Sequence, residues 1–193
     1  MNKFVEIFFI SIFSLPIISL ILFTAILVKI FDGSPILYKQ TRIGKDWKKF
    51  RIYKLRTMEI NKSRNMNFKG KNITKLGRIL RKFKLDELPQ IINIIKNEMS
   101  LIGPRPEIPS NFLLKNKKKW NEILKVKPGI TDLASIEFRN ESELLNKSKN
   151  PKKLYLEKIL PKKLHLNQKY INNRSLYLDL KIIIKTIIII FIK

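Results

Sequence analysis

The amino-acid sequence predicts an α+β protein, mainly helical with a small β-hairpin, that is attached to a membrane. Three observations lead to this fold class: an uncharged apolar run near the N-terminus, two neighbouring segments rich in β-forming residues, and helical spacing of apolar residues in later segments. The 193 residues suffice for one domain with a modest core, plus an appendage.

Composition limits the chemistry that the chain can perform. It has no Cys, which excludes disulfides, thiolate nucleophiles and cysteine-ligated zinc. The single His, His165, argues against a His-based metal site or a Ser-His-Asp triad. Carboxylates, Lys, Arg and hydroxyls remain. The 40 Lys and Arg against 15 Asp and Glu give a net charge of +25. This charge indicates an anionic partner: the phosphates of a small molecule, anionic lipid or nucleic acid.

The N-terminal apolar run is long enough to enter a membrane. Residues 7–28 carry no charge, and as a helix they would extend about 33 Å at roughly 1.5 Å per residue. The basic stretch 39–56 follows, which predicts that the rest of the chain lies on the cytoplasmic side. Pro16 interrupts the run. The segment either spans the membrane as a kinked helix or re-enters the same leaflet, and the tolerance of spanning helices for Pro favours spanning.

These features divide the chain into two parts. Residues 1–31 are the predicted membrane segment, and residues 32–193 are a domain at the cytoplasmic face. A second apolar stretch, about 176–193, is punctuated by Lys181, Lys185 and Lys193. We interpret it as an interfacial helix whose lysines reach the polar layer, and a buried core helix is the alternative.

The first elements of the domain form a predicted β-hairpin. Residues 36–43 and 50–58 are rich in β-formers and flank a Gly-Lys-Asp-Trp connection. Strand alternation brings a polar or basic set to one face, which could hold phosphate oxygens or could be a solvated basic surface. This set consists of Gln40, Arg42, Lys54 and Arg56.

Helical segments follow the hairpin. Residues 74–83 have helical apolar spacing, with Arg78 on the opposite, basic face. A second amphipathic helix is predicted over residues 86–97. Residues 100–106 leave it as an irregular loop, and residues 127–132 contain a Pro-Gly turn. Basic surface helices are expected over 111–126 and 151–159.

Two adjacent acids, Asp86 and Glu87, stand at the start of the predicted second helix. One carboxylate could bind a divalent cation such as Mg²⁺ while the other faces a phosphate, or one could act as a nucleophile that forms an acyl phosphate. The simpler alternative is that Asp86 is an N-cap and Glu87 a first-turn acid. Further along, Pro104 and Pro106 restrict the backbone around Arg105. A rigid guanidinium suits bidentate phosphate binding, and a solvated Arg after a helix stop is the alternative.

The ordered motifs of this chain resemble the bacterial sugar transferase family, the monotopic polyprenyl-phosphate phosphoglycosyl transferases. The resemblance covers most of residues 10–187, so we expect a small form that consists of the catalytic domain alone. The matching stretches are Ser34-Pro35 through Gln40-Thr-Arg-Ile-Gly44, Tyr53-Lys-Leu-Arg-Thr-Met58, Leu76-Gly-Arg-Ile-Leu-Arg81, Leu85-Asp-Glu-Leu-Pro-Gln90, Met99-Ser-Leu-Ile-Gly-Pro-Arg-Pro106, Lys127-Pro-Gly-Ile-Thr131 and Asp179-Leu-Lys-Ile.

The resemblance implies a reaction and a place for it. A sugar 1-phosphate would pass from a UDP-sugar to polyprenyl (undecaprenyl) phosphate, releasing UMP through a covalent aspartyl-phosphosugar intermediate. This is the initiating step in the synthesis of a lipid-linked glycan: a polysaccharide, an O-antigen or a glycoprotein glycan. It would occur at the cytoplasmic face of the bacterial inner membrane, among anionic lipids.

The resemblance also implies roles for particular residues. Asp86 would be the nucleophile and Glu87 a Mg²⁺ ligand. The expected phosphate-binding residues are Lys54, Arg56, Arg105, Arg78, Arg42 and Gln40. The family's anchor is a re-entrant helix broken at a Ser-Pro pair, which favours a re-entrant anchor broken near Pro16, although Leu15 separates Ser14 from Pro16 here. Asp132 stands where the family often has Gly.

Two other functions would also fit parts of the sequence. A membrane-tethered basic protein that binds anionic lipid or polymer would use the charge alone, without the acid pair. A transferase that moves only the sugar would release UDP. No nucleic-acid-binding motif is apparent, and the sequence does not indicate the sugar or the oligomeric state.

Overall fold

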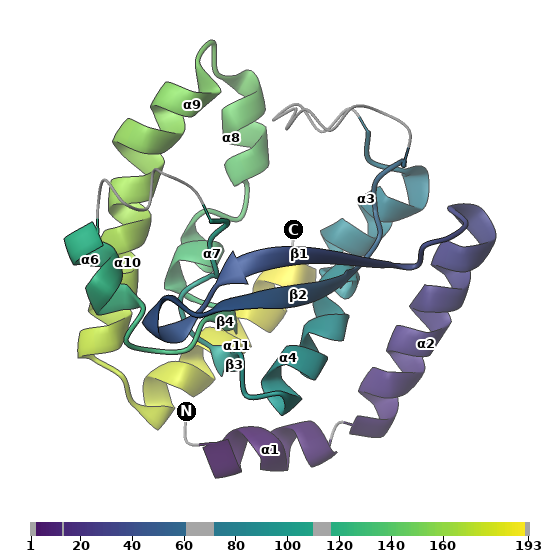
Figure 1. Ribbon diagram of the computed structural model, residues 1–193, viewed down its shortest axis with the longest axis horizontal. Coiled ribbons are helices and arrows are strands. Elements are labelled where there is room, and N and C mark those ends of the chain that lie inside the picture. Colours follow the sequence, from purple (N-terminus) through teal and green to yellow (C-terminus); the bar gives the residue numbers. More distant parts are fainter. Residues whose placement is uncertain (1–2, 13, 61–71, 110–116, 192–193) are drawn as a thin grey trace.

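The computed structural model describes residues 3–12, 14–60, 72–109 and 117–191, which are mainly helical and contain two small β-sheets, in agreement with the predicted α+β class (Figure 1). The first part comprises α1 (Lys3–Ile12), α2 (Ser14–Phe31), β1 (Leu37–Ile43), the 3-10 turn η1 (Lys45–Trp47), β2 (Lys49–Leu55), α3 (Lys75–Lys82), the 3-10 turn η2 (Leu85–Gln90), α4 (Ile91–Ile95) and β3 (Ser100–Ile102). The second part comprises α6 (Lys117–Ile123), β4 (Gly129–Thr131), α7 (Leu133–Glu137), α8 (Glu141–Lys147), α9 (Pro151–Leu154), the π-helical turn η3 (Tyr155–Ile159), α10 (Leu160–Asn172) and α11 (Leu176–Phe191).

The predicted β-hairpin is confirmed. Strands β1 and β2 pair antiparallel, and Tyr38 lies opposite Lys54. On β2, Phe50 and Ile52 are buried and pack against Ile94 of α4. Because residues two apart on a strand share a face, this packing also turns Lys54 toward the adjacent turn η2.

A buried amide fixes the hairpin against α4. Asn93 is fully buried, its Oδ1 accepts a hydrogen bond from the amide of Tyr53 (3.2 Å), and its Nδ2 donates to the carbonyl of Arg51 (2.8 Å). The same Nδ2 donates to the carboxylate of Glu98 (2.7 Å). A satisfied buried amide specifies one arrangement, so β2 has a defined position beside η2 and α4.

The second sheet was not predicted. Strands β3 and β4 pair in parallel, with Ser100 opposite Gly129 and Ile102 opposite Thr131, where the sequence predicted a loop and a turn. Gly103 and Gly129 allow the two backbones to approach closely, since a Cβ at Gly129 would lie 2.1 Å from the amide nitrogen of Gly103. The sheet thereby holds the segment after β3 beside α7.

The N-terminal apolar run forms two helices that are not collinear: α1 lies across one end of α2 (Figure 1). Residue 13, between the two helices, lies outside the described residues, and Pro16 occupies the first turn of α2. A first-turn Pro forfeits no intrahelical hydrogen bond. The described part of the run is therefore two helices, and the predicted break near Pro16 stays a prediction. Among the described helices, α2 is long and apolar enough to cross a membrane, by length and composition alone.

Both ends of this N-terminal segment contact the rest of the domain. On α1, Glu6 is buried, and its Oε1 accepts hydrogen bonds from the hydroxyl of Ser100 and from the amide of Leu101 (3.1 Å). On α2, Val28 is fully buried in a cluster with Leu55 and Leu80. The apolar segment therefore contacts the same domain near its start and near its end.

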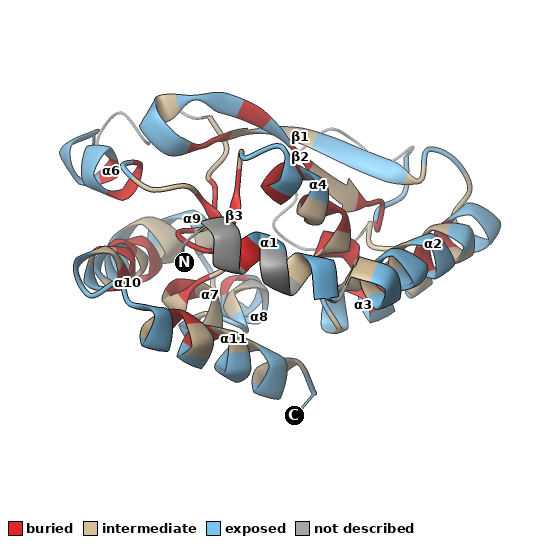
Figure 2. Ribbon diagram, turned by 90° about the horizontal axis from the view of Figure 1, so that it is seen from below, coloured by how far each residue is buried: buried red, intermediate tan, exposed pale blue. Residues whose placement is uncertain are grey.

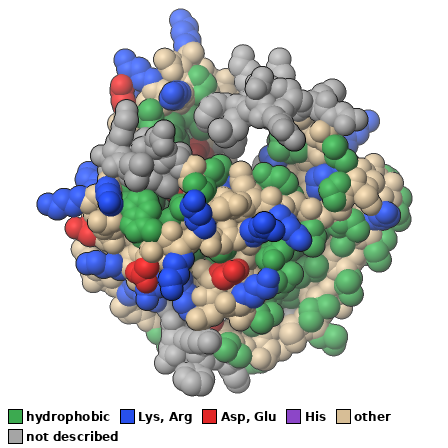
Figure 3. Space-filling view, in the orientation of Figure 1, with side chains coloured by type: hydrophobic (Ala, Val, Ile, Leu, Met, Phe, Trp, Pro, Cys, Tyr) green, Lys and Arg blue, Asp and Glu red, His purple; other side chains and the backbone are tan. Residues whose placement is uncertain are grey.

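The predicted C-terminal helix is confirmed as α11 over its described residues. It buries Asp179 and Ile182 and leaves Ile184 and Phe191 exposed, so it is not a core helix along its length. Figure 2 shows the hairpin along one side of the molecule and α11 along the other, with exposed surface on both α2 and α11. In the view of Figure 3, hydrophobic side chains gather along the side occupied by α2, whereas Lys and Arg are spread over the hairpin.

Candidate active site

The two acids lie in a buried 3-10 turn. Lys84, with a left-handed φ of 59°, precedes η2 and occupies its N-cap position, so the alternative in which Asp86 caps the helix is wrong. Asp86 and Glu87 are each 6% exposed. The predicted α-helix over residues 86–97 begins as this turn, which contains Pro89, and becomes α-helical only in α4. The acids are therefore held inside the fold.

Glu87 binds two cations from two other segments. Its Oε1 lies 2.7 Å from Nζ of Lys54 on β2 and 2.7 Å from Nη2 of Arg105 in the loop after β3. Its Oε2 accepts a longer hydrogen bond of 3.4 Å from Nη1 of Arg105. Burial raises the pKa of Glu87, but Arg105 and Lys54 outweigh it and hold that pKa well below its usual range. Glu87 is therefore ionised at neutral pH.

The two cations respond differently to this shared carboxylate. The charge of Glu87 raises the pKa of Arg105, against the effect of burial. Burial, followed by repulsion from Arg105, lowers the pKa of Lys54, and Glu87 only partly offsets this. The side chain of Arg105 is 36% exposed, so it also faces the open side of the site. Lys54 and Arg105 together carry two positive charges against the one negative charge of Glu87, so this group of three side chains is net positive.

Asp86 differs from its neighbour. Its Oδ1 is buried and has no hydrogen-bond partner in the described part of the chain. Burial and the adjacent Glu87 raise the pKa of Asp86, while Lys54, Lys84 and Arg81 act in the opposite direction. A buried carboxylate oxygen without a partner is costly for stability and is available to a reacting group. Lys84 and Arg81 had no predicted role, although both belong to the basic stretch directly before the acids.

Two further predicted residues join the loop of Arg105. Arg42 donates from Nη2 to Oε1 of Gln40 (2.6 Å) and from Nη1 to the carbonyl of Pro106 (3.1 Å). Burial and Arg105 lower the pKa of Arg42. Arg42 thus contacts the Arg105 loop directly at Pro106, and Gln40 is linked to this loop by its hydrogen bond with Arg42.

Arg56 and Arg78 lie elsewhere. Arg56 is buried and donates to the carbonyls of Asp32 and Gly33 (2.8 Å to the latter), so it holds the end of α2 against the hairpin. Arg78 is exposed on α3. Neither makes a hydrogen bond or ion pair with Asp86 or Glu87 in the described structure. Their predicted phosphate-binding role gains no support from this arrangement.

A cavity of about 820 Å³ is lined in part by Glu87. Its charged lining residues include Lys84, Glu87, Arg105 and Arg139. Its other walls come from α1, α2, η2, α4, β3, β4, α7 and α11, and most of them are apolar. Representative apolar lining residues are Ile10, Ile17, Ile91, Leu101, Ile130, Ile136, Ile183 and Ile187. A mostly apolar lining with several cationic side chains suits an apolar molecule that carries an anionic group.

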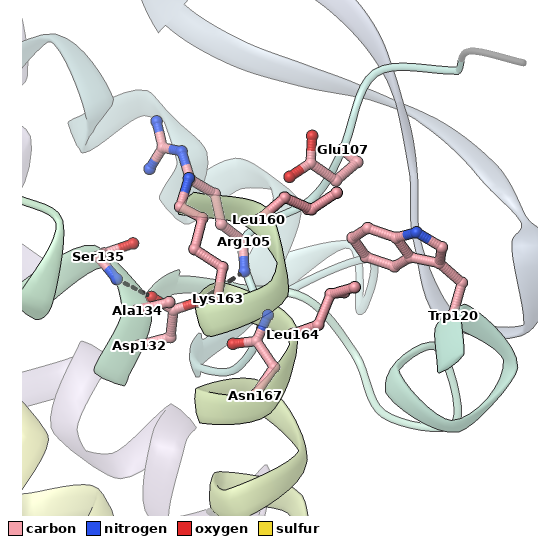
Figure 4. Close-up of a pocket in the computed structure, with 10 residues that line it drawn as sticks. All are labelled: Arg105, Glu107, Trp120, Asp132, Ala134, Ser135, Leu160, Lys163, Leu164 and Asn167. Atoms are coloured by element: carbon pink, nitrogen blue, oxygen red, sulfur yellow. Dashed lines mark hydrogen bonds between the residues drawn. The ribbon is translucent and has the colours of Figure 1, made fainter. Parts of the chain in front are cut away.

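A smaller pocket adjoins the other side of Arg105, where Lys163 and Glu107 also line its wall (Figure 4). Burial raises the pKa of Glu107, and the cations Lys163, Arg42 and Arg105 only partly offset this. Asp132 and Ser135 lie at the base of Arg105 in the same view. The loop of Arg105 is thus supported on one side while its guanidinium reaches Glu87 on the other.

The residues offer limited ligands for a metal ion. No group of three or more His, Cys, Asp or Glu side chains that could hold a metal occurs among the described residues. At Glu87, a cation would have to compete with Lys54 and Arg105 for Oε1. Asp86 Oδ1 is the unpartnered acid oxygen. A Mg²⁺ ion here would fit with most of its oxygen ligands supplied by water and a bound phosphate group.

The chain belongs to the bacterial sugar transferase family, whose model matches residues 1–193. It is 38% identical over 170 residues to the uncharacterized sugar transferase EpsL of Bacillus subtilis (strain 168), covering 87% of this chain and 76% of that protein. It is 30% identical to the UDP-glucose:undecaprenyl-phosphate glucose-1-phosphate transferase of Escherichia coli (strain K12), covering 84% of this chain and 34% of that protein.

A third relative carries a different sugar in its name. It is the UDP-N-acetylgalactosamine-undecaprenyl-phosphate N-acetylgalactosaminephosphotransferase of Aeromonas hydrophila, 32% identical, with 92% of this chain and 40% of that protein covered. The chain therefore spans most of the Bacillus protein but well under half of the other two. Family membership confirms the predicted family and its enzyme class, the sugar transferases.

Proposed function

We propose that this protein transfers a sugar 1-phosphate from a UDP-sugar to undecaprenyl phosphate or a similar polyprenyl phosphate, and that UMP is released. The observation that carries this proposal is the buried, unpartnered Oδ1 of Asp86, next in the chain to Glu87, which holds two cations and lines a mostly apolar cavity together with Arg105. The names of the Escherichia and Aeromonas relatives describe reactions of this kind.

In the first step, the ionised carboxylate of Asp86 attacks the β-phosphorus of the UDP-sugar. A bond forms between the carboxylate oxygen and phosphorus, and the bond from that phosphorus to the oxygen bridging the two phosphates breaks. UMP leaves with this oxygen and its electron pair, and no proton transfer is required. Lys54 and Arg105 stabilise the negative charge that develops on the phosphate oxygens.

In the second step, a phosphate oxygen of the acceptor attacks the same phosphorus. The bond to Asp86 breaks, the free carboxylate returns, and the product is a polyprenyl diphosphate sugar. The two substrates react in turn at one carboxylate, so the kinetics are ping-pong. The apolar lining of the cavity would hold the acceptor's tail, and the Lys and Arg side chains in the same lining would bind the acceptor's phosphate.

Glu87 has a supporting role in this mechanism. Its low pKa keeps it ionised, and the single oxygen Oε1 holds Lys54 from the hairpin and Arg105 from the loop at the same time. The two cations are therefore in place before the phosphate arrives, and little reorganisation is needed during the reaction. Mg²⁺ is part of the proposal: the donor phosphates and Asp86 would hold it, and it would neutralise phosphate charge.

The contacts of α1 and α2 support a re-entrant anchor. Glu6 near the start and Val28 near the end of the apolar segment both pack on one domain, which a helix crossing the bilayer between them would prevent. We place this domain at the cytoplasmic face of the bacterial inner membrane, with α11 in the interface. There the excess positive charge meets anionic lipids. The reaction would begin the synthesis of a lipid-linked glycan.

The nucleotide product tests this function most simply. Purified protein in detergent, given a panel of UDP-sugars and undecaprenyl phosphate, should release UMP with at least one donor. Release of UDP would show transfer of the sugar alone. Absence of any release, with salt-sensitive binding to anionic vesicles, would favour the membrane-tethered basic binding protein, for which the buried acid cluster has no use.

A further inference from the structure

Asp132 is a buried carboxylate at the base of the Arg105 loop. It is 1% exposed and lies between β4 and α7. Its Oδ2 accepts a hydrogen bond from the backbone amide of Arg105 (2.9 Å), and its Oδ1 accepts one from the amide of Ser135 (Figure 4). Each oxygen of this carboxylate therefore holds a different segment.

The backbone amide of Arg105 lies between two prolines. Pro104 and Pro106 have no N–H, so Arg105 supplies the amide hydrogen of this tripeptide. The carbonyl of Pro104 accepts from the amide of Gly129 (3.0 Å), and Asp132 holds the next amide along the chain. From this fixed backbone, the Arg105 side chain extends to Glu87 at 2.7 Å.

We propose that Asp132 is a positioning residue for the transfer reaction: its contact with the Arg105 amide sets the guanidinium on Glu87 and toward the phosphate. This inference rests on the proposed function. A displacement of about 1 Å in a reacting arrangement can lower a rate on the order of a hundredfold, so a backbone contact this close to Arg105 affects catalysis without touching substrate.

The alternative is that Asp132 serves only as the N-cap of α7. Serine separates the two roles, because its one hydroxyl oxygen can still cap through the Ser135 amide but leaves the Arg105 amide without its acceptor. Asp132→Asn is a closer isostere. Its one carbonyl oxygen can serve only one of the two amides, and its NH₂ group opposes the other.

A double-mutant cycle distinguishes these roles. Wild type, Asp132→Ser, Arg105→Ala and the double variant are compared by kcat and KM for UMP release. Asp132→Ser should lower kcat by between about tenfold and a hundredfold, with a smaller change in KM for the donor. It should have no further effect in the Arg105→Ala background. Equal losses in both backgrounds would overturn the proposal.

The control variant removes an N-cap elsewhere. Asn150 caps α9 by accepting from the amide of Lys153 (3.1 Å), and it is not part of the site. Asn150→Ala should lower the melting temperature by an amount comparable to Asp132→Ser and leave kcat unchanged. A similar fall in kcat for both variants would show that lost stability, and not the position of Arg105, explains the effect.

A second readout does not depend on activity. Amide hydrogen exchange is measured by mass spectrometry on overlapping peptides that contain Pro104-Arg105-Pro106. Within this tripeptide, Arg105 provides the exchanging amide. Exchange there should be slow in wild type and in Asn150→Ala, and markedly faster in Asp132→Ser. Unchanged exchange would overturn the proposal. If wild type releases no UMP, the proposed function fails, while this measurement still decides whether Asp132 holds Arg105.

Discussion

Nζ of Lys54 lies 2.7 Å from Oε1 of Glu87, and this ion pair joins the β-hairpin to the turn that carries Asp86. Both side chains are largely buried, with exposed fractions of 15% and 8%. Buried ion pairs are not in general a source of stability, because desolvation offsets the attraction. The pair is therefore better explained by what it prepares, a cation fixed beside a reactive carboxylate.

Lys54→Met should reduce UMP release by about a hundredfold or more, because it removes one of the charges that stabilise the reacting phosphate. The measurement is kcat/KM for the donor. Lys96→Met is the matched control: Lys96 contacts the same strand at an exposed site, through the Tyr53 hydroxyl (2.9 Å), away from the acids. Its activity should be unchanged. Wild-type turnover in Lys54→Met would remove Lys54 from the mechanism.

The raised pKa of Asp86 predicts the acid limb of the pH profile. The nucleophile must be ionised, so the first turnover should accelerate as pH rises through a pKa above the usual 3.8 of aspartate. Rapid-quench measurement of UMP release between about pH 4 and 8 tests this. A rate independent of pH throughout that range would contradict the environment assigned to Asp86.

The same carboxylate should destabilise the fold at neutral pH. Because its folded pKa is raised, ionisation costs stability as pH rises through that value, and the cost is absent when the group is protonated in both states. Asp86→Asn should therefore be more stable than wild type at pH 7, by on the order of 1 kcal/mol, and the difference should vanish near pH 3. Thermal denaturation at both pH values measures it. Equal stability at pH 7 would argue that Oδ1 finds a partner in solution.

Mg²⁺ and Glu87 can be separated by titration. We expect chelation to abolish UMP release and added Mg²⁺ to restore it. Glu87→Gln should lower kcat by roughly a hundredfold, because Lys54 and Arg105 lose their common counter-charge. Its half-saturating Mg²⁺ concentration should stay near that of wild type. A large increase in that concentration would instead identify Glu87 as a metal ligand.

The re-entrant anchor predicts the location of the N-terminus. Since the chain has no Cys, an Asn2→Cys variant carries a single reactive thiol. In intact cells, an impermeant thiol reagent should leave it unlabelled, and it should react after the inner membrane is opened. Lys152→Cys, on α9, is the control for the cytoplasmic side. Labelling of Asn2→Cys in cells with only the outer barrier permeabilised would indicate a spanning helix.

Local sequence features predicted a good part of this fold. The hairpin followed from β-forming residues around a short polar connection, and Thr74, which caps α3 by accepting from the amide of Gly77, marks the start of the predicted helix. The acid pair was recognisable because acids are few in this basic chain, and Arg105 because it lies between two prolines. These signals act within a few residues, which is the range over which propensity and spacing are informative.

The remaining features depend on contacts between distant segments. Strands β3 and β4 have three residues each, too few to show alternation. The pairing of Lys54 with Glu87, and of Glu6 with Ser100, leaves no local signal. Arg56 was misplaced beside Lys54 because alternation was extended one residue beyond the end of β2.

Burial in the helix after η2 also depends on more than local spacing. The amphipathic helix predicted over residues 86–97 assumed regular α-helical spacing from Asp86, but the 3-10 turn η2 winds more tightly and shifts the later positions around the axis. Ile94 is buried and Ile95 is 71% exposed. Regular α-helical spacing therefore does not tell which of these neighbouring side chains is buried.

The central claim is that Asp86 becomes covalently phosphorylated during the reaction. The direct measurement is the mass of the intact protein, followed by peptide mapping, after incubation with a reactive UDP-sugar and no acceptor. We predict an adduct with the mass of one sugar phosphate on the peptide that contains Asp86, lost on addition of undecaprenyl phosphate and absent in Asp86→Asn. UMP release that requires the acceptor, with no adduct at any time, would contradict it.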